Sequence, residues 1–169
     1  MTRDDLAGLF AYSEWATARL FDAAAALDAD AWARDLGGSL PTLGGTLAHV
    51  VGSEWLWLRR WQEDEPTAAP TWTAAPTPDG LRAALAEVER DRAQFLARLT
   101  DADLDRPLTY TLFSGAVQTL PLREVLLQVV FHSMYHRGQI ASKLRELGTA
   151  PPATDYLVYA VQRSQPDGA

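Results

Sequence analysis

Hydrophobic side chains recur every three or four residues in four long stretches of the chain, with polar residues between them. This spacing puts the apolar positions on one face of an α-helix. It predicts amphipathic helices over about residues 2–27, 42–62, 80–100 and 121–148. The inward face of the first helix is expected to hold Leu6, Phe10, Ser13, Thr17, Leu20, Ala24 and Leu27.

Turn-forming residues separate these helices. Residues 35–45 are rich in glycine, and residues 63–80 contain four prolines with little periodicity, which indicates a long surface connection. Residues 108–120 combine strand-forming residues with a turn at Ser114 and Gly115, so we expect a short β-hairpin there.

The ends of the helices carry their own signals. Thr2 and Asp79 are expected to cap the first and third helices, and Pro121 suits the first position of the fourth. A short last helix is expected from Thr154, followed by a loose tail over residues 164–169. The side chains expected to pack this last helix are Tyr156, Leu157 and Val161.

Together these elements predict an all-α fold, an up-down four-helix bundle with a short β-hairpin before the fourth helix and a short C-terminal helix. No internal repeat or composition change divides the chain, so residues 1–169 are expected to form a single domain.

Composition narrows the partners. The formal charge of −7 repels phosphate backbones, so we expect no nucleic-acid partner. No apolar run reaches the length of a membrane-spanning helix, and the N-terminus lacks the pattern of a signal peptide, so we expect a cytoplasmic protein without a membrane partner. The chain contains no cysteine, and any thiol chemistry would need a thiol supplied from outside.

Two of the three histidines lie four residues apart on the predicted fourth helix. That spacing stacks His132 and His136 on one face, where their imidazoles can converge on one metal ion. The continuous apolar stripe on which they lie consists of Val125, Val129, His132, His136, Ile140 and Leu144.

The third histidine, His49, lies on the predicted second helix. Its helical neighbours Gly45, Gly52 and Ser53 are small and leave space, which a ligand site needs. These histidines could be ordinary core residues with hydrogen-bond partners. However, burying several imidazoles is costly unless each nitrogen has a partner, and a metal ion satisfies one nitrogen of each.

Three imidazoles would leave an open coordination position, as in catalytic zinc sites. We expect one divalent ion per chain, zinc or nickel ahead of iron, although the ligand type alone does not decide. Ser133 follows His132 where a metalloprotease helix carries its glutamate base, which argues against that route of peptide hydrolysis.

Several neighbours of the histidines are weaker candidates. Gln139, three residues after His136, could orient an imidazole or a ligand. Arg137 could pair with an anionic cofactor, although a solvated or interface arginine is the preferred interpretation. Arg92 falls on the inward face of the third helix, where a buried guanidinium needs a carboxylate partner, so we expect a structural ion pair. Trp72 could line a cleft or cover a dimer surface.

The segment HSMYHRGQIASKLRELGTAPPATDYL, residues 132–157, closely resembles the signature of the DinB/YfiT-like family. FAYSEWATARLF, TLAHVVGSEWLWL and PLREVL occur in the family's order, so the resemblance covers nearly the whole chain. It implies a four-helix bundle, often dimeric, in which three histidines hold a divalent metal. Residue by residue, those histidines match His49, His132 and His136.

Related proteins include thiol-dependent transferases that use bacillithiol or mycothiol. The resemblance therefore implies a metal-dependent transferase that joins a low-molecular-weight thiol to electrophiles in stress or detoxification. It also implies a homodimer, since proteins of the family often pair. The alternatives are a metal-dependent hydrolase, or a non-catalytic stress-response protein that binds a metal or a ligand.

Overall fold

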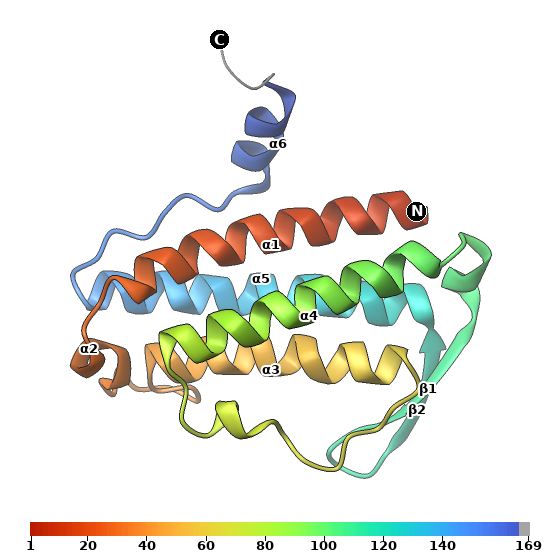
Figure 1. Cartoon of the computed structure of the whole chain (residues 1–169), viewed down its shortest axis with the longest axis horizontal. Helices are drawn as coiled ribbons and strands as arrows, with labels where there is room; N and C mark the ends of the chain where they lie inside the picture. The colour runs from red at the N-terminus through yellow and green to blue at the C-terminus, as the bar shows by residue number, and fades with distance from the viewer. Residues whose placement is uncertain (166–169) are drawn as a thin grey trace.

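The computed structural model describes residues 1–165, and four long helices dominate it (Figure 1). They are α1 (Arg3–Ala25), α3 (Leu43–Trp61), α4 (Pro78–Arg98) and α5 (Leu122–Glu146). Each lies within a few residues of its predicted range, which confirms the helical periodicity. Among the described residues, no helix is both long and apolar enough to cross a membrane.

Threonine side chains cap three of these helices. The hydroxyl of Thr2 accepts from the backbone N–H of Asp5, and Thr42 and Thr77 act in the same way for α3 and α4. The prediction that Asp79 caps α4 is therefore wrong, because Thr77 caps it and Asp79 lies in its first turn. Pro121 is the N-cap of α5 rather than its first helical residue.

Shorter elements fill the connections. Helix α2 (Ala29–Ala33) and the 3₁₀ turns η1 (Thr71–Thr73) and η2 (Ala102–Asp105) were not predicted. The predicted hairpin is present as antiparallel strands β1 (Pro107–Thr111) and β2 (Val117–Pro121). Its tip turns at Gly115, whose φ of +84° favours glycine. Leu108 and Tyr110 point from β1 into the core.

The last helix, α6 (Tyr156–Ser164), stands off the bundle beside α1 (Figure 1). The prediction of this helix is confirmed, but the prediction that Tyr156, Leu157 and Val161 pack it is wrong. Leu157 is 73% exposed, and Tyr156 and Val161 are also exposed. Helix α6 touches the bundle through aromatic contacts of Tyr156 and Tyr159 with α1, so its apolar face stays uncovered. The expected loose tail lies outside the described residues from position 166 onward.

Helices α1 and α3 each pack against both α4 and α5, which gives a four-sided bundle. Helices α3 and α4 run in the same direction, opposite to α1 and α5 (Figure 1). Accordingly Trp61, near the end of α3, stacks on Phe95, near the end of α4, and meets Phe10, near the start of α1. The helices therefore do not simply alternate up and down, because the connection over residues 62–77 runs back along the length of the bundle before α4 begins.

A buried polar layer divides the core into two hydrophobic clusters. One cluster lies around Trp61 and Leu126, and the other lies around Phe21 and Ile140. Between them the buried polar side chains are Ser13, Thr17, Glu54, Arg92, Ser133, His136 and Arg137. Every long helix contributes to this layer.

Arg92 holds the layer together. Its guanidinium is 2% exposed and pairs with Glu54, which is 4% exposed on α3, and with Glu14 on α1 at 2.8 Å. Glu54 also accepts a hydrogen bond of 2.8 Å from the hydroxyl of Ser133 on α5. The expected ion pair of Arg92 is therefore confirmed, and it ties all four long helices together.

Replacing Arg92 should destabilise the bundle strongly. Arg92→Met keeps much of the side-chain volume but leaves Glu54 and Glu14 without their cation, so the free energy of unfolding should fall by about 3–5 kcal/mol. Urea denaturation monitored by circular dichroism measures this loss. Arg82→Met is the matched control, because Arg82 pairs with Asp22 in an exposed bridge, where the expected cost is below about 1 kcal/mol. Equal losses in the two variants would contradict the role given to Arg92.

Candidate metal centre

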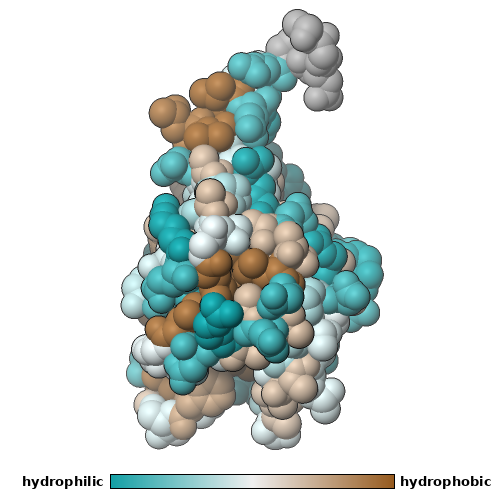
Figure 2. Space-filling view, turned by 90° about the vertical axis from the view of Figure 1, so that its left-hand side faces the viewer, coloured by the Kyte–Doolittle hydropathy of each residue, from teal (hydrophilic) through white to brown (hydrophobic). Residues whose placement is uncertain are grey.

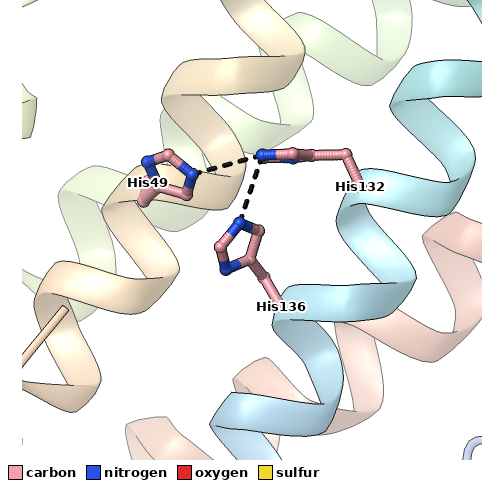
Figure 3. Close-up of side chains that lie close together, drawn as sticks. All are labelled: His49, His132 and His136. Atoms are coloured by element: carbon pink, nitrogen blue, oxygen red, sulfur yellow. Dashed lines mark hydrogen bonds between the residues drawn. The ribbon is translucent and has the colours of Figure 1, made fainter. Parts of the chain in front are cut away.

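The structure brings all three histidines together. His49 projects from α3, and His132 and His136 project from successive turns of α5, the helix that packs beside it (Figure 3). The Nε2 atom of His132 lies 3.3 Å from Nε2 of His49 and 3.1 Å from Nε2 of His136. One nitrogen from each ring falls within 4.8 Å of the other two.

These distances are the ones that a shared ion requires. Nitrogens bound to zinc at about 2.0–2.1 Å in tetrahedral geometry lie about 3.3–3.4 Å apart. The separations of His132 from the other two rings, 3.3 and 3.1 Å, are close to that value, and all three nitrogens lie within 4.8 Å of one another. The rings therefore need only small movements to become three ligands of one ion.

Gln139 fixes the orientation of one ring. Its side-chain oxygen lies 2.8 Å from Nδ1 of His136. Because a carbonyl oxygen accepts, this contact assigns the proton to Nδ1 and leaves a lone pair on Nε2, directed at the other two histidines. A contact of this kind outside the coordination sphere is usual for metal-binding imidazoles.

The local electrostatics keep the rings of His49 and His132 neutral. Burial lowers the pKa of His132 to about 4, and the neighbouring imidazoles of His136 and His49 contribute to this lowering, against a smaller opposing effect of Glu54. Burial, followed by the proximity of His136, also lowers the pKa of His49. A neutral imidazole is the form that binds a metal ion. Both rings are therefore in the ligand form at neutral pH.

Glu54 is the residue of this neighbourhood that the sequence-based predictions missed. It occupies a core position on α3, in the apolar series Leu47, Val51, Glu54, Leu58 and Trp61, and that position was a readable signal. Its carboxylate is engaged by Arg92 and by Ser133, the residue after His132. Glu54 therefore supports α5 beside the histidines.

Arg137 lies away from the three imidazoles. Its side chain is buried against α1, where it donates to the hydroxyl of Ser13 at 2.7 Å and lies over the ring of Tyr12. The preferred interpretation as a solvated or interface arginine is therefore wrong. Helix α5 packs against α1 as well as α3, so a residue one position off the histidine stripe still faces the core.

Comparisons with known proteins agree with this architecture. The family model of the DinB family matches residues 1–168. Protein DinB of Bacillus subtilis (strain 168) is 25% identical over 167 residues, which cover 89% of this chain and 91% of that protein.

Two solved structures share the fold. YfiT from Bacillus subtilis, described as a probable metal-dependent hydrolase with an unusual four-helix bundle topology, matches with a TM-score of 0.71 at 18% identity, over 89% of this chain and 91% of that one. A DinB-like protein from Bacillus cereus ATCC 10987 matches with a TM-score of 0.63 at 19% identity, over 90% and 97% of the two chains.

The metal-free protein should lose stability as the pH falls from about 6.5 to about 4. Over that interval the unfolded chain takes up a proton on His132, where the imidazole has its ordinary pKa of 6.5, while the folded ring, with a pKa of about 4, does not. Protonation therefore stabilises the unfolded state relative to the native state as the pH falls. The contribution of His132 to the free energy of unfolding is fully present only above pH 6.5.

Urea midpoints of chelator-treated protein across this pH range measure the effect, and His132→Gln should flatten the curve. Because the chain has three histidines, the imidazole protons can also be followed one by one by NMR. A His132 signal that titrates near pH 6.5 would contradict this prediction.

Proposed function

The chain belongs to the DinB family, and from this premise we propose that His49, His132 and His136 bind one divalent metal ion in an enzyme of small-molecule chemistry. The observation that carries the proposal is the convergence of three Nε2 atoms at 3.1 and 3.3 Å. We place zinc and nickel ahead of iron, although imidazole ligands suit all three. Among residues 1–165 no thiolate or carboxylate joins the set.

A divalent ion in an open three-histidine site lowers the pKa of a thiol or a water molecule and so supplies a nucleophile at neutral pH. Gln139 holds the His136 ring in the tautomer that presents Nε2. Arg92 and Ser133 engage Glu54, so this carboxylate joins the helices that carry the histidines. The residues of the chain thus position the ligands, and the nucleophile comes from outside.

We propose a low-molecular-weight thiol, of the bacillithiol or mycothiol kind, as that nucleophile, acting in stress or detoxification. In the reaction the thiol releases its proton to solvent and its sulfur forms a bond to an electrophilic carbon. The bond from that carbon to its leaving group breaks, and the leaving group departs with the electron pair. The absence of cysteine from the chain agrees with a thiol supplied as a separate molecule. Family membership supports the same choice.

Hydrolysis is the second candidate. It is supported by the likeness to YfiT, which is described as a probable metal-dependent hydrolase. The two activities would use the same histidines and differ only in whether a thiol or water attacks. A third possibility is a metal- or ligand-binding protein of the stress response without turnover.

The metal content of the tag-free protein tests the proposal directly. Mass spectrometry should find about one equivalent of zinc, nickel or iron per chain, and His49→Ala, His132→Ala and His136→Ala should each lose it. Ser142→Ala, on the same helix as two of the histidines, is the matched control and should keep its metal. A wild type that stays metal-free when offered these three ions would overturn the proposed centre.

The reaction is then assayed with bacillithiol, mycothiol and glutathione against an aromatic halide, and with a nitrophenyl ester for hydrolysis. We expect conjugation that chelation abolishes and that metal restores. Metal-dependent ester cleavage without conjugation would favour the hydrolase. Metal binding without either activity would favour the non-catalytic alternative.

We also propose that the protein pairs as a homodimer through α6. This helix places Tyr156, Leu157 and Val161 on the surface, and Figure 2 shows hydrophobic side chains gathered on the protruding segment. Exposed apolar side chains on a projecting element are typical of interaction sites. Its anchors to the bundle, such as the bond from the Tyr12 hydroxyl to the Thr154 carbonyl, involve the root of the helix.

Charges on this face should separate the two copies. Leu157→Asp combined with Val161→Asp is expected to shift the mass measured by light scattering from two chains to one, because burying carboxylates in an apolar interface is costly. Gln162→Asp, on the same helix, is the matched control and should stay dimeric. A wild type that is monomeric at tens of micromolar would contradict the pairing.

A further inference from the structure

A cavity of about 360 Å³ lies beside His49, on the partly exposed face of α3 that carries Gly45, Gly52 and Ser53. Helix α3 forms its floor, the returning connection over residues 66–73 forms one wall, and Phe113 at the tip of the hairpin closes one end. His49 belongs to both places, because its ring lines the cavity while its Nε2 faces His132. The cavity therefore borders the candidate metal centre at His49.

Small residues of α3 create this space. Gly45, Gly52 and Ser53, the neighbours of His49 on the helix, all line the cavity. At Gly52 an added Cβ would lie 3.3 Å from the Thr73 methyl group, so glycine permits the connection to approach α3 closely. Trp72 packs partly buried against the adjacent core and steadies this turn.

Arg60 contacts the tip of the hairpin, which carries Phe113. Its buried guanidinium donates to the Thr111 carbonyl at 2.5 Å and lies over the rings of Trp57, Tyr110 and Phe113. The ring of Phe113 is 95% exposed and lies at the edge of the cavity. An exposed phenylalanine at the edge of an apolar cavity is suited to cover a bound molecule.

The lining selects for uncharged molecules. It is made by prolines, alanines, Leu56, Trp55 and Phe113, with hydroxyl groups from Ser53 and two threonines, and it contains no aspartate, glutamate, lysine or arginine among the described residues. A charged ligand would lose hydration there without gaining a partner. The second cavity, of about 260 Å³, is lined by Lys143 and Glu146 and by none of the three histidines.

We propose that the cavity beside His49 binds the uncharged, apolar part of the substrate and directs its reactive end toward the three histidines. This inference rests on the proposed function for the reaction itself and adds the class of substrate. The volume suits a small aromatic or short aliphatic group. Ser53, Gly52 and Phe113 determine specificity, because they set the depth and the cover of the site.

The test uses 1-alkanols and 1-alkanethiols of three to six carbons, competing with the uncharged fluorescent dye N-phenyl-1-naphthylamine. With metal-free protein, the affinity of both series should rise about fourfold for each added methylene, because each enters an apolar site. With the zinc-loaded protein, the thiols should in addition bind more tightly than the alcohols of equal length. Chain-length dependence reports on the cavity, and the difference between thiol and alcohol reports on the metal centre.

Two variants locate the binding. Ser53→Trp fills the cavity from its floor and should weaken hexanol at least tenfold, whereas Ser142→Trp, which fills the second cavity, should bind as the wild type does. If Ser53→Trp does not fold, Phe113→Ala removes the cover at an exposed position and should weaken the longer alcohols while leaving the melting temperature unchanged.

Affinity that is independent of chain length, or that is lost in Ser142→Trp instead, would overturn the cavity as the substrate site. The same would follow if both Ser53→Trp and Phe113→Ala bound as the wild type does. A normal chain-length series with no preference for thiols in the zinc-loaded protein would leave the cavity standing and count against the proposed thiol chemistry. The two proposals can therefore fail separately.

Discussion

The burial of the Arg92 guanidinium is the constraint on which the rest of the structure depends. A charge in the middle of a bundle is tolerated only with carboxylates held at the correct positions, and here they come from Glu14 on α1 and Glu54 on α3. Glu54 extends the contact to Ser133 on α5. These bonds fix the heights and rotations of four helices at once. Since Ser133 follows His132, they also set how α5 presents its histidines to α3.

The direction of the helices links this framework to the cavity. Because α3 and α4 are parallel, the chain must travel back along the bundle between them, and residues 62–77 do so across the outer face of α3. On that face Gly52 lets the turn at Thr73 come close. A short loop between antiparallel helices would leave the same face of α3 open to solvent. The cavity beside His49 thus follows from the connectivity as much as from its lining.

The sequence predicted those features that depend on local periodicity. The four helices, the hairpin and the shared face of His132 and His136 all follow from spacing along the chain. Contacts between helices were harder to predict, because the hydrophobic pattern of one helix does not say which other helices pack against its flanks. Arg137 is buried since α5 packs against α1 too. The parallel course of α3 and α4 depends on the path of a proline-rich connection, which periodicity does not describe.

The side chains near the three histidines argue for chemistry in which the nucleophile is a separate molecule. The chain has no cysteine, and Glu54, the carboxylate whose charge acts on His132, is already engaged by Arg92 and Ser133. Freeing that carboxylate for proton transfer would break the contact that holds the helices in register. The histidines direct one ring nitrogen each toward a common point, and an apolar cavity opens beside His49. Under the proposed function, such a site would provide a place for activation and a place for the substrate, and the attacking atom would come from a second small molecule.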